Sequence, residues 1–315
     1  MNRTPLIGLA LTSLIFSQTI LAAETVDQTQ SLQGQAKVSV NVQRGDVVFK
    51  SWDKNQVSVK GELDELSEGL TFTVNGSHVV IEDKMPRQYN GNNKDGSNLT
   101  IMLPQQIKLQ AEGVSANYRI DAFNGKMDIS SVSGDIKASQ LKDKVMLHTV
   151  SGDISSRALS GKVMLETVSG EIKDTDSSGK VAYRLVSGEL TANSRADQIS
   201  VELVSGDATV ALGDVDSLSI KTVSGDIELS VGKLTDKAKL GSVSGDIEVH
   251  FTSEVNVSFN INGGPGGTIK NKLSNDQVSK EQYSPQTYLK FQAGDGSANL
   301  NASTISGNIA LSNTN

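Results

Sequence analysis

The chain has 315 residues, a formal net charge of −7 and no cysteine. The lack of cysteine excludes a disulfide scaffold, a thiolate zinc site and a cysteine nucleophile. The acidic balance argues against a nucleic-acid partner, because phosphates attract basic surfaces. Only 4% of the residues are aromatic and 37% are hydrophobic, which is little for a thick globular core. The chain is therefore either partly disordered or folded as a thin, repetitive structure.

The N-terminus has the pattern of an export signal. One charge, at Arg3, precedes an apolar stretch over residues 6–21, and Ala22 and Ala23 follow as a small-residue cleavage site. The stretch is interrupted by polar residues, whereas a transmembrane helix needs about 20 predominantly apolar residues. We therefore expect residues 1–23 to be a cleaved signal peptide, with an uncleaved anchor as the alternative. The mature protein is then periplasmic, at the cell surface or secreted, with no transmembrane segment.

Residues 24–113 are predicted to form an N-terminal β region that caps the fold. A hairpin is expected around Asn75 and Gly76, because this pair is a strong turn signal. Residues 99–103 and 107–109 are predicted to be strands, separated by a proline that cannot continue the first one.

Within residues 114–250 a motif of four residues, Val-Ser-Gly followed by an acid, recurs seven times. Residues three and five positions before each valine are apolar, and another apolar residue follows the acid, which is the period of a strand. Each repeat divides into near-halves, so each coil should hold two short strands and two turns. Glycine is required where a turn needs a positive φ or a close backbone approach. The copies follow at steps of 18, 18, 18, 18, 19 and 20 residues and begin at Val132, Val150, Val168, Val186, Val204, Val223 and Val243.

These features predict an all-β protein, a β-solenoid of the parallel β-helix or β-roll kind. Its coils should have about 18 residues and turn right-handed, the default for parallel β connections. One coil buries too little apolar surface to fold alone, so coils must stack at the strand spacing of about 4.8 Å. Residues 251–315 are expected to form a C-terminal β region and cap, which ends in a degenerate copy of the repeat at residues 305–309.

The sequence resembles a known group of bacterial proteins. The matching features are the export signal, the Gly45-Asp46-Val47-Val48 opening, the strand near residue 100 and the serial Val-Ser-Gly-Asp-Ile copies. They resemble the "putative adhesin" family of exported β-strand-repeat proteins of unknown function, over most of residues 31–315. The resemblance implies a β-solenoid in the cell envelope and supplies no catalytic residues.

The acids that follow the turn glycines are expected to form a column along one edge of the stack. Carboxylates about 5 Å apart repel by ~1 kcal/mol per pair in water, and a divalent cation such as Ca²⁺ would relieve this repulsion. The favoured interpretation is a solvated column screened by salt, because the glycine-rich nonapeptide of calcium β-rolls is absent. We predict no catalytic or cofactor-binding residue, and the one candidate for a metal is this column of Asp135, Asp153, Glu171, Glu189, Asp207, Asp226 and Asp246.

A basic column lies half a coil from the acids and is expected on the opposite edge. The two charged edges either orient partners or keep the protein soluble. A third column, two positions before each valine, alternates in sign and favours in-register stacking. The basic column consists of Lys126, Lys144, Lys162, Lys180 and Lys237, and the alternating column of His148, Glu166, Arg184, Glu202 and Lys221.

The threonines before the valines and the three histidines are weak signals of function. Thr149, Thr167 and Thr222 directly precede valines and would suit a flat array for ice or a crystal surface, but Leu185 and Leu203 interrupt them. The histidines are scattered, with no second histidine or acid at ligand spacing, so no metal or catalytic role is expected for His78, His148 or His250.

We therefore predict a non-catalytic exported protein of the cell envelope. It would be adhesin-like or a scaffold that presents an extended surface to an unknown envelope or surface macromolecule. The alternatives are a polysaccharide-active parallel β-helix enzyme and a calcium-stabilised surface-binding module. The enzyme is disfavoured because the repeats hold one aromatic residue, Tyr183, and no irregular insertion that would build a cleft.

Overall fold

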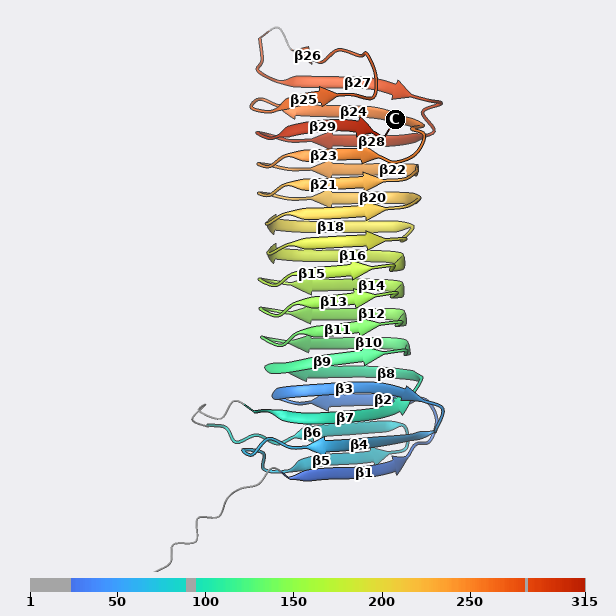
Figure 1. Cartoon of the computed structure of the whole chain (residues 1–315), viewed down its shortest axis with the longest axis vertical. Helices are drawn as coiled ribbons and strands as arrows, with labels where there is room; N and C mark the ends of the chain where they lie inside the picture. The colour runs from blue at the N-terminus through green and yellow to red at the C-terminus, as the bar shows by residue number, and fades with distance from the viewer. Residues whose placement is uncertain (1–23, 89–94, 281–282, 315) are drawn as a thin grey trace, which may run out of the picture.

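The computed structural model describes residues 24–88, 95–280 and 283–314, so the predicted signal peptide lies outside the described residues. The described residues form 29 strands and no helix. The strands build two long sheets that stack coil upon coil into an elongated body (Figure 1). The prediction of an all-β solenoid is confirmed.

Sheet A has 14 strands, and most of those in its middle are short. In spatial order its strands are β1 (Thr25–Ser31), β4 (Gln56–Glu62), β7 (Ser97–Pro104), β3 (Arg44–Trp52), β9 (Ser115–Asp121), β11 (Ile136–Ser139), β13 (Ile154–Arg157), β15 (Ile172–Thr175), β17 (Leu190–Ser194), β19 (Ala208–Leu212), β21 (Ile227–Val231), β23 (Ile247–Phe251), β29 (Asn308–Asn313) and β25 (Thr268–Asn271).

Sheet B has 15 strands, and those of the repeats are longer than the sheet A strands of the same coils. In spatial order its strands are β26 (Ser279–Lys280), β27 (Thr287–Ala293), β24 (Val257–Gly264), β28 (Ala298–Ser303), β22 (Leu234–Gly241), β20 (Val215–Lys221), β18 (Gln198–Ser205), β16 (Ser178–Ser187), β14 (Ser160–Thr167), β12 (Lys142–Thr149), β10 (Asn124–Ser131), β8 (Gln106–Gly113), β2 (Ala36–Asn41), β6 (His78–Asp83) and β5 (Leu70–Asn75).

Each central coil contains one strand of each sheet. The pairing is parallel and steps by one repeat, so Ile136 lies beside Ile154, and Ile154 beside Ile172. In the repeats, strands of sheet B point to the left in Figure 1 and those of sheet A to the right, so the Val-Ser-Gly-acid turns gather at the left edge. The coil of 18 residues with two strands is thereby confirmed. A register shift between Val215 and Ser217, in the pairing of β20 with β22, accommodates an additional residue.

The two ends are built differently from the repeats, because the chain leaves the stack and returns to it. At the N-terminal end β2 pairs with both β6 and β8, and β3 pairs with both β7 and β9. Strands β4 to β7 therefore lie beyond the first coil, joined by antiparallel pairs of β1 with β4, β4 with β7 and β5 with β6. The hairpin around Asn75 and Gly76 is confirmed as the turn between β5 and β6.

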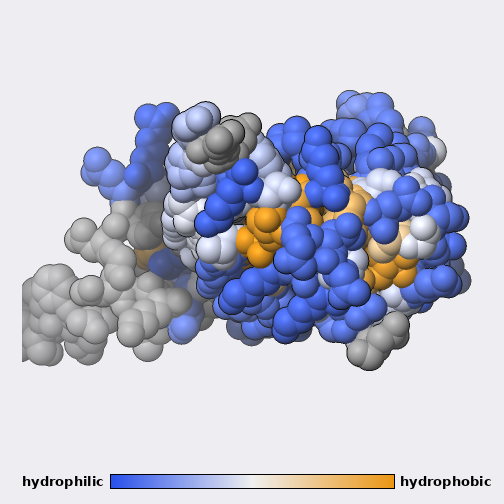
Figure 2. Space-filling view, turned by 90° about the horizontal axis from the view of Figure 1, so that it is seen from above, coloured by the Kyte–Doolittle hydropathy of each residue, from blue (hydrophilic) through white to orange (hydrophobic). Residues whose placement is uncertain are grey.

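The C-terminal end repeats this plan. The degenerate copy at residues 305–309 leads into β29, which pairs with β23 and places Ile309 beside Ile247. Strands β24 and β27 lie further out and pair in antiparallel. Seen from that end, the molecule is mostly hydrophilic, with apolar residues gathered in a band near the middle (Figure 2). The last copy of the repeat thus closes on the seventh copy, and the intervening segment forms the end of the stack.

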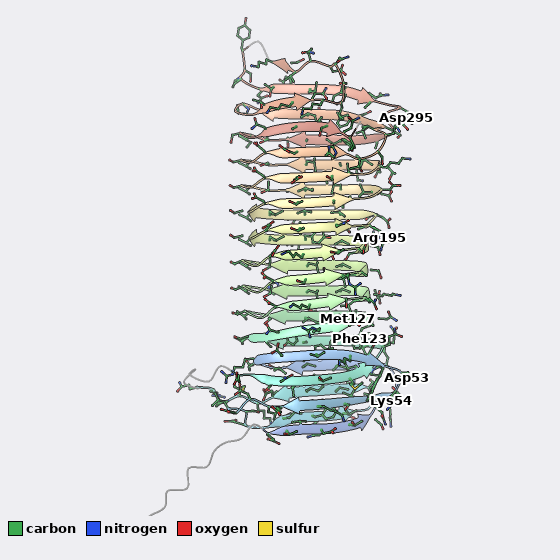
Figure 3. The ribbon with its side chains drawn as sticks, in the orientation of Figure 1. Asp53, Lys54, Phe123, Met127, Arg195 and Asp295 are labelled. Carbon is green, nitrogen blue, oxygen red and sulfur yellow. The ribbon has the colours of Figure 1, made fainter. Side chains whose placement is uncertain are left out.

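The core is a narrow layer between the sheets. Phe123 and Met127 are fully buried in it, whereas Arg195 lies at the edge of the stack (Figure 3). The alternation of inward and outward residues along each strand fills this layer mainly with Val, Ile, Leu and Ala. Aromatic rings pack on one another near both ends. Phe259 stacks on Phe291 at 4.4 Å and meets Phe251 edge-on at 5.9 Å near the C-terminal end, and Phe49 stacks on Tyr118 at 6.1 Å near the N-terminal end.

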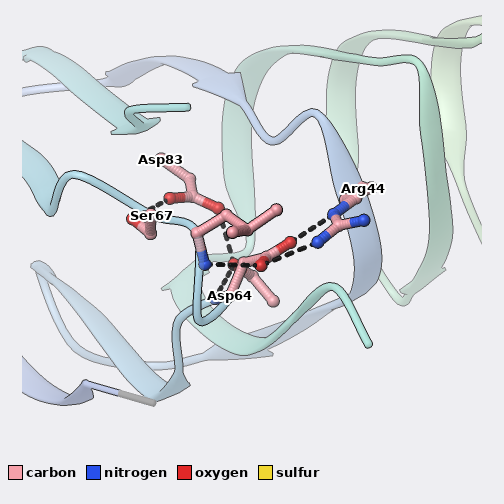
Figure 4. A network of polar contacts seen from close by, with 6 residues as sticks. Arg44, Asp64, Ser67 and Asp83 are labelled. Carbon is pink, nitrogen blue, oxygen red and sulfur yellow. Dashed lines mark hydrogen bonds and ion pairs between the residues drawn. The ribbon is translucent and has the colours of Figure 1, made fainter. Parts of the chain in front are cut away.

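A buried polar network holds the N-terminal excursion to the first coil (Figure 4). Arg44 donates two hydrogen bonds to Asp64, one of them at 2.9 Å to Oδ1, and the Asp64 side chain is fully buried. Ser67 and Ser97 each donate to a different oxygen of Asp83 at 2.5 Å. Burial raises the pKa of Asp64, but the bonds from Arg44 and a backbone N–H outweigh it, so this pKa lies below its usual range.

A second buried carboxylate, Asp174, lies in the core of the central stack. It accepts hydrogen bonds from Ser156 at 2.5 Å, from Ser177 at 2.6 Å and from the Tyr183 hydroxyl at 2.6 Å. Burial, and then the neighbouring Asp174 charge, raise the pKa of Tyr183 well above its usual range. Tyr183 is therefore a core residue whose hydroxyl serves this network.

Candidate functional site

The predicted acid column lies along one edge of the stack, where each acid immediately precedes a strand of sheet A. Oδ1 of Asp135 accepts a hydrogen bond from the backbone N–H of Asp153 at 3.0 Å, and Asp153 accepts one from Glu171 at 2.8 Å. Asp207 and Asp226 bind the next coil in the same way, each at 2.8 Å. One oxygen of each of these aspartates is thus part of a ladder that links successive coils.

The ladder changes where the acid is glutamate, whose side chain is one methylene longer. Glu171 pairs with Lys173 at 2.8 Å, and this hydrogen bond raises the pKa of Lys173. Asparagines stand at both ends of the column. Asn117 accepts from the N–H of Asp135 at 2.9 Å, and Asn308 donates its backbone N–H to Asp246 at 2.8 Å, which lowers the pKa of Asp246.

The valines of the same turns form an exposed apolar column beside the acids. Their exposed fractions lie between 43% and 49% at five of the seven copies. The column extends to a valine before the first copy and to an isoleucine in the last one, with similar exposure. An apolar column and the acid column therefore lie side by side along one edge. The exposed members of the apolar column are Val114, Val132, Val186, Val204, Val223, Val243 and Ile305.

The threonines before the valines point inward, which excludes the flat surface array that the sequence already disfavoured. Thr149 and Thr167 are buried. The Thr149 hydroxyl accepts from the N–H of Gly152 at 3.0 Å and donates to the Gly134 carbonyl at 3.3 Å, so it closes the turn. The physical reason is parity, because this position shares the inward face with the apolar residues two and four positions earlier.

The turn glycines are fixed by the close approach of neighbouring coils, as predicted. A Cβ on Gly152 would lie 2.1 Å from the carbonyl oxygen of Gly134, which no side chain can occupy. The same contact with the glycine one coil earlier recurs at Gly170, Gly188, Gly206, Gly225 and Gly245. Each of these glycines therefore permits its turn to stack directly on the one before it.

The basic column lies on the outward face of sheet B, at the ends of its strands away from the acidic turns. Lys126, Lys144, Lys162 and Lys180 stand side by side in successive strands. Lys237 occupies the same column but is separated from Lys180 by Gln198 and Ser217. The alternating column also stacks as predicted, with His148 Nδ1 4.0 Å from Glu166 and Arg184 Nε 3.2 Å from Glu202.

Sequence reasoning missed two members of the basic column. Strand pairing places Lys108 beside Lys126 and Lys37 beside Lys108. Lys108 lies 18 residues before Lys126, so the repeat spacing could have found it. Lys37 lies 71 residues before Lys108, and only the return of the chain after the N-terminal excursion brings the two together.

His250 lies in a shallow groove of about 300 Å³ near the C-terminal end of sheet A. Its two ring nitrogens are each 3.1 Å from a hydroxyl oxygen, those of Ser312 and Thr314, and Glu228 and Lys270 also line the groove. Over residues 24–88, 95–280 and 283–314, no three His, Asp or Glu side chains gather closely enough to hold a metal ion. In the same ranges, no helix has the length and apolar content to cross a bilayer.

The fold and its surface columns define a class of protein, a two-sheet β-solenoid whose exposed charged and apolar side chains form columns along the stack. Residues 36–312 match the family model named Toastrack DUF4097. The chain belongs to this family, which confirms the resemblance found in the sequence. A comparison with curated proteins finds no match.

Several solved structures are similar to the chain. A "putative cell adhesion protein" from Clostridium sporogenes is 12% identical, with 92% of this chain and 100% of that chain covered and a TM-score of 0.24. A "putative lipid binding protein" from Parabacteroides distasonis is 13% identical, with coverages of 92% and 97% and a TM-score of 0.40. A "putative adhesin" from Bacteroides fragilis is 11% identical, with coverages of 91% and 97% and a TM-score of 0.39.

Proposed function

We propose that the protein is a non-catalytic, exported protein of the cell envelope, adhesin-like or a scaffold, that binds a large envelope or surface partner along its stack. One observation carries this proposal, the edge along which an acid recurs in every copy of the repeat and an exposed valine in five of the seven copies. A repeated surface of this kind suits an extended partner, because each coil offers the same contacts as its neighbour. The export signal predicted at residues 1–23 supports a location in the periplasm, at the cell surface or outside the cell.

The local chemistry of the edge supports binding rather than catalysis. The aspartates already accept hydrogen bonds from the next coil, so their positions are fixed by the stack. General acid–base catalysis by paired carboxylates needs groups placed around a reacting bond, usually within a cleft. The acids of this edge instead stand in single file on an open surface.

A deletion strain tests the proposal. We expect loss of attachment to surfaces or to neighbouring cells, restored by the wild-type gene. Purified protein should leave a panel of polysaccharides intact. Turnover of any polysaccharide by the purified protein, or unchanged attachment of the deletion strain, would contradict the proposal.

A further inference from the structure

Two columns on the outward face of sheet B differ in their order of charges. The column near the acidic turns alternates in sign, as His148 with Glu166 and Arg184 with Glu202. At the other end of the same strands, six lysines follow one another in register with no opposite charge between them. This lysine ladder consists of Lys37, Lys108, Lys126, Lys144, Lys162 and Lys180.

The lysines of the ladder are exposed to solvent, and in the part of the chain that the structure describes their positive charges are almost all without a neighbouring acid in an ion pair. All six lysines are exposed, and they lie on strands about 4.8 Å apart. Among the described residues, only Lys126 of the six forms an ion pair, with Asp128 at 3.7 Å. Like charges at about 4 Å repel by ~1 kcal/mol in water, so a bound anion at each step would stabilise the arrangement.

The N-terminal part of the ladder borders a shallow groove of about 290 Å³. Lys37, Lys108 and Lys126 line it together with His78, which stands beside Lys37 in the next strand. Val80 also lines the groove and is 41% exposed. The groove therefore offers a row of cations next to apolar atoms.

We propose that the lysine ladder binds a linear acidic polysaccharide with one carboxylate per sugar, lying along the stack. A pyranose ring advances its chain by nearly the strand spacing of about 5 Å, so ammonium and carboxylate groups recur at the same step. Flexible lysine stems reach carboxylates that alternate in direction. The C–H groups of the rings pack on Val80. The ladder is a second surface, separate from the edge of valines and acids. The proposal rests on the proposed function, because it gives the envelope protein a further partner, of stated chemistry, on this second surface.

The same geometry disfavours two other anionic partners. An acidic peptide strand presents side chains on one face every ~6.7 Å, so it drifts out of register with the ladder within a few steps. An anionic bilayer would contact the whole face of sheet B, which also carries Glu112, Asp128 and Glu166. The ladder is one residue wide, which matches a single polymer chain.

Binding of the purified full-length protein to polygalacturonate tests the proposal. The ladder variant K37Q/K108Q/K126Q is compared with K50Q/K137Q/K239Q, which removes the same charge from exposed lysines outside the ladder. Methyl-esterified polygalacturonate is the matched ligand without charge. We expect the ladder variant to bind polygalacturonate roughly tenfold more weakly, as three lost exposed ion pairs predict, and the control variant to bind like the wild type. Added salt should weaken wild-type binding.

Equal losses in the two variants, or equal binding of the charged and esterified polymers, would overturn the proposal. Ladder-dependent binding of polyphosphate or of phosphatidylglycerol vesicles, with none of polygalacturonate, would overturn it in favour of that partner. Equal melting temperatures of the variants show that folding is unaffected. Attachment of the deletion strain is measured separately, so that a failure of polysaccharide binding and a failure of the proposed function are distinguishable.

Discussion

Asp135 and Asp153 lie 18 residues apart in the sequence, and Oδ1 of the first accepts a hydrogen bond from the backbone N–H of the second at 3.0 Å. The bond joins two coils at the turn, beside the point where their sheet A strands begin. The column of acids is therefore in the first place a structural ladder that links successive coils.

Removal of one rung should cost stability. We expect Asp153→Ala to lower the free energy of unfolding by about 1 kcal/mol, because it removes the acceptor for the N–H of Glu171. Asp153→Asn should retain most of the stability, since Asn117 serves as an acceptor in the same column. The control is Glu189→Ala, at an exposed surface position outside the aspartate ladder, for which a change within about 0.5 kcal/mol is expected. Urea denaturation measures the free energy of unfolding of all three variants. Equal losses in Asp153→Ala and Glu189→Ala would show that the aspartate ladder does not stabilise the stack.

The close stacking of turn glycines predicts a larger effect at Gly152. Gly152→Ala places a Cβ 2.1 Å from the Gly134 carbonyl oxygen, so the two coils must separate. We expect a loss of about 3 kcal/mol or more, in the range that marks a specific disruption. Gly213→Ala is the matched control, because a Cβ there meets no atom within 4 Å. A similar unfolding midpoint for the two variants would refute the close approach.

Two buried threonines provide a paired test of the turn hydrogen bonds. Thr167 accepts from the N–H of Gly170 at 3.0 Å, whereas the buried Thr222 hydroxyl has no hydrogen-bond partner within the described residues. Thr167→Val should cost about 1–3 kcal/mol, since it leaves a buried N–H unpaired. Thr222→Val should be neutral or stabilising, because it removes an unpaired hydroxyl. Chemical denaturation distinguishes these outcomes, and the reverse order would contradict the assignment.

The Arg44–Asp64 pair predicts sensitivity to acid. The pKa of Asp64 is lower in the folded protein than in the unfolded chain, so its contribution is present above the unfolded pKa of about 3.9 and is lost as the pH falls through the folded pKa. Asp64→Asn should be less stable than the wild type at pH 7, and the difference should shrink below about pH 4. Denaturation midpoints of both proteins between pH 7 and pH 3 measure this difference. A gap independent of pH would show that the Asp64 charge does not contribute.

The calcium-stabilised alternative has its own test. Because the aspartates already bind backbone N–H groups through Oδ1, we expect the melting temperature to be the same in EDTA and in millimolar Ca²⁺. A clear rise with Ca²⁺, absent with Mg²⁺, would instead assign a cation to the acid column.

The repeats could be predicted from the sequence because the residues of each coil determine how it aligns with the next coil. The 18-residue step, the inward apolar positions and the acid column all follow from local spacing. What could not be predicted depends on excursions of the chain. Lys37 joins the lysine ladder beside Lys108 only because the segment between these two residues leaves the stack and returns. Asn308 reaches Asp246 for the same reason at the C-terminal end. The inward direction of Thr149 also follows from the strand period, which gives a second reason against the disfavoured flat array.

Photo-crosslinking in intact cells tests most directly whether the edge of the stack is the binding surface. A photoreactive residue is placed at Val186 or Val204 on the edge, and at Tyr283, which is 95% exposed and lies outside the repeats, as the control. We predict that both edge positions crosslink to the same envelope macromolecule and that the more exposed Tyr283 does not. Crosslinks from Tyr283 alone, or none from the edge in cells that attach normally, would contradict the proposed function.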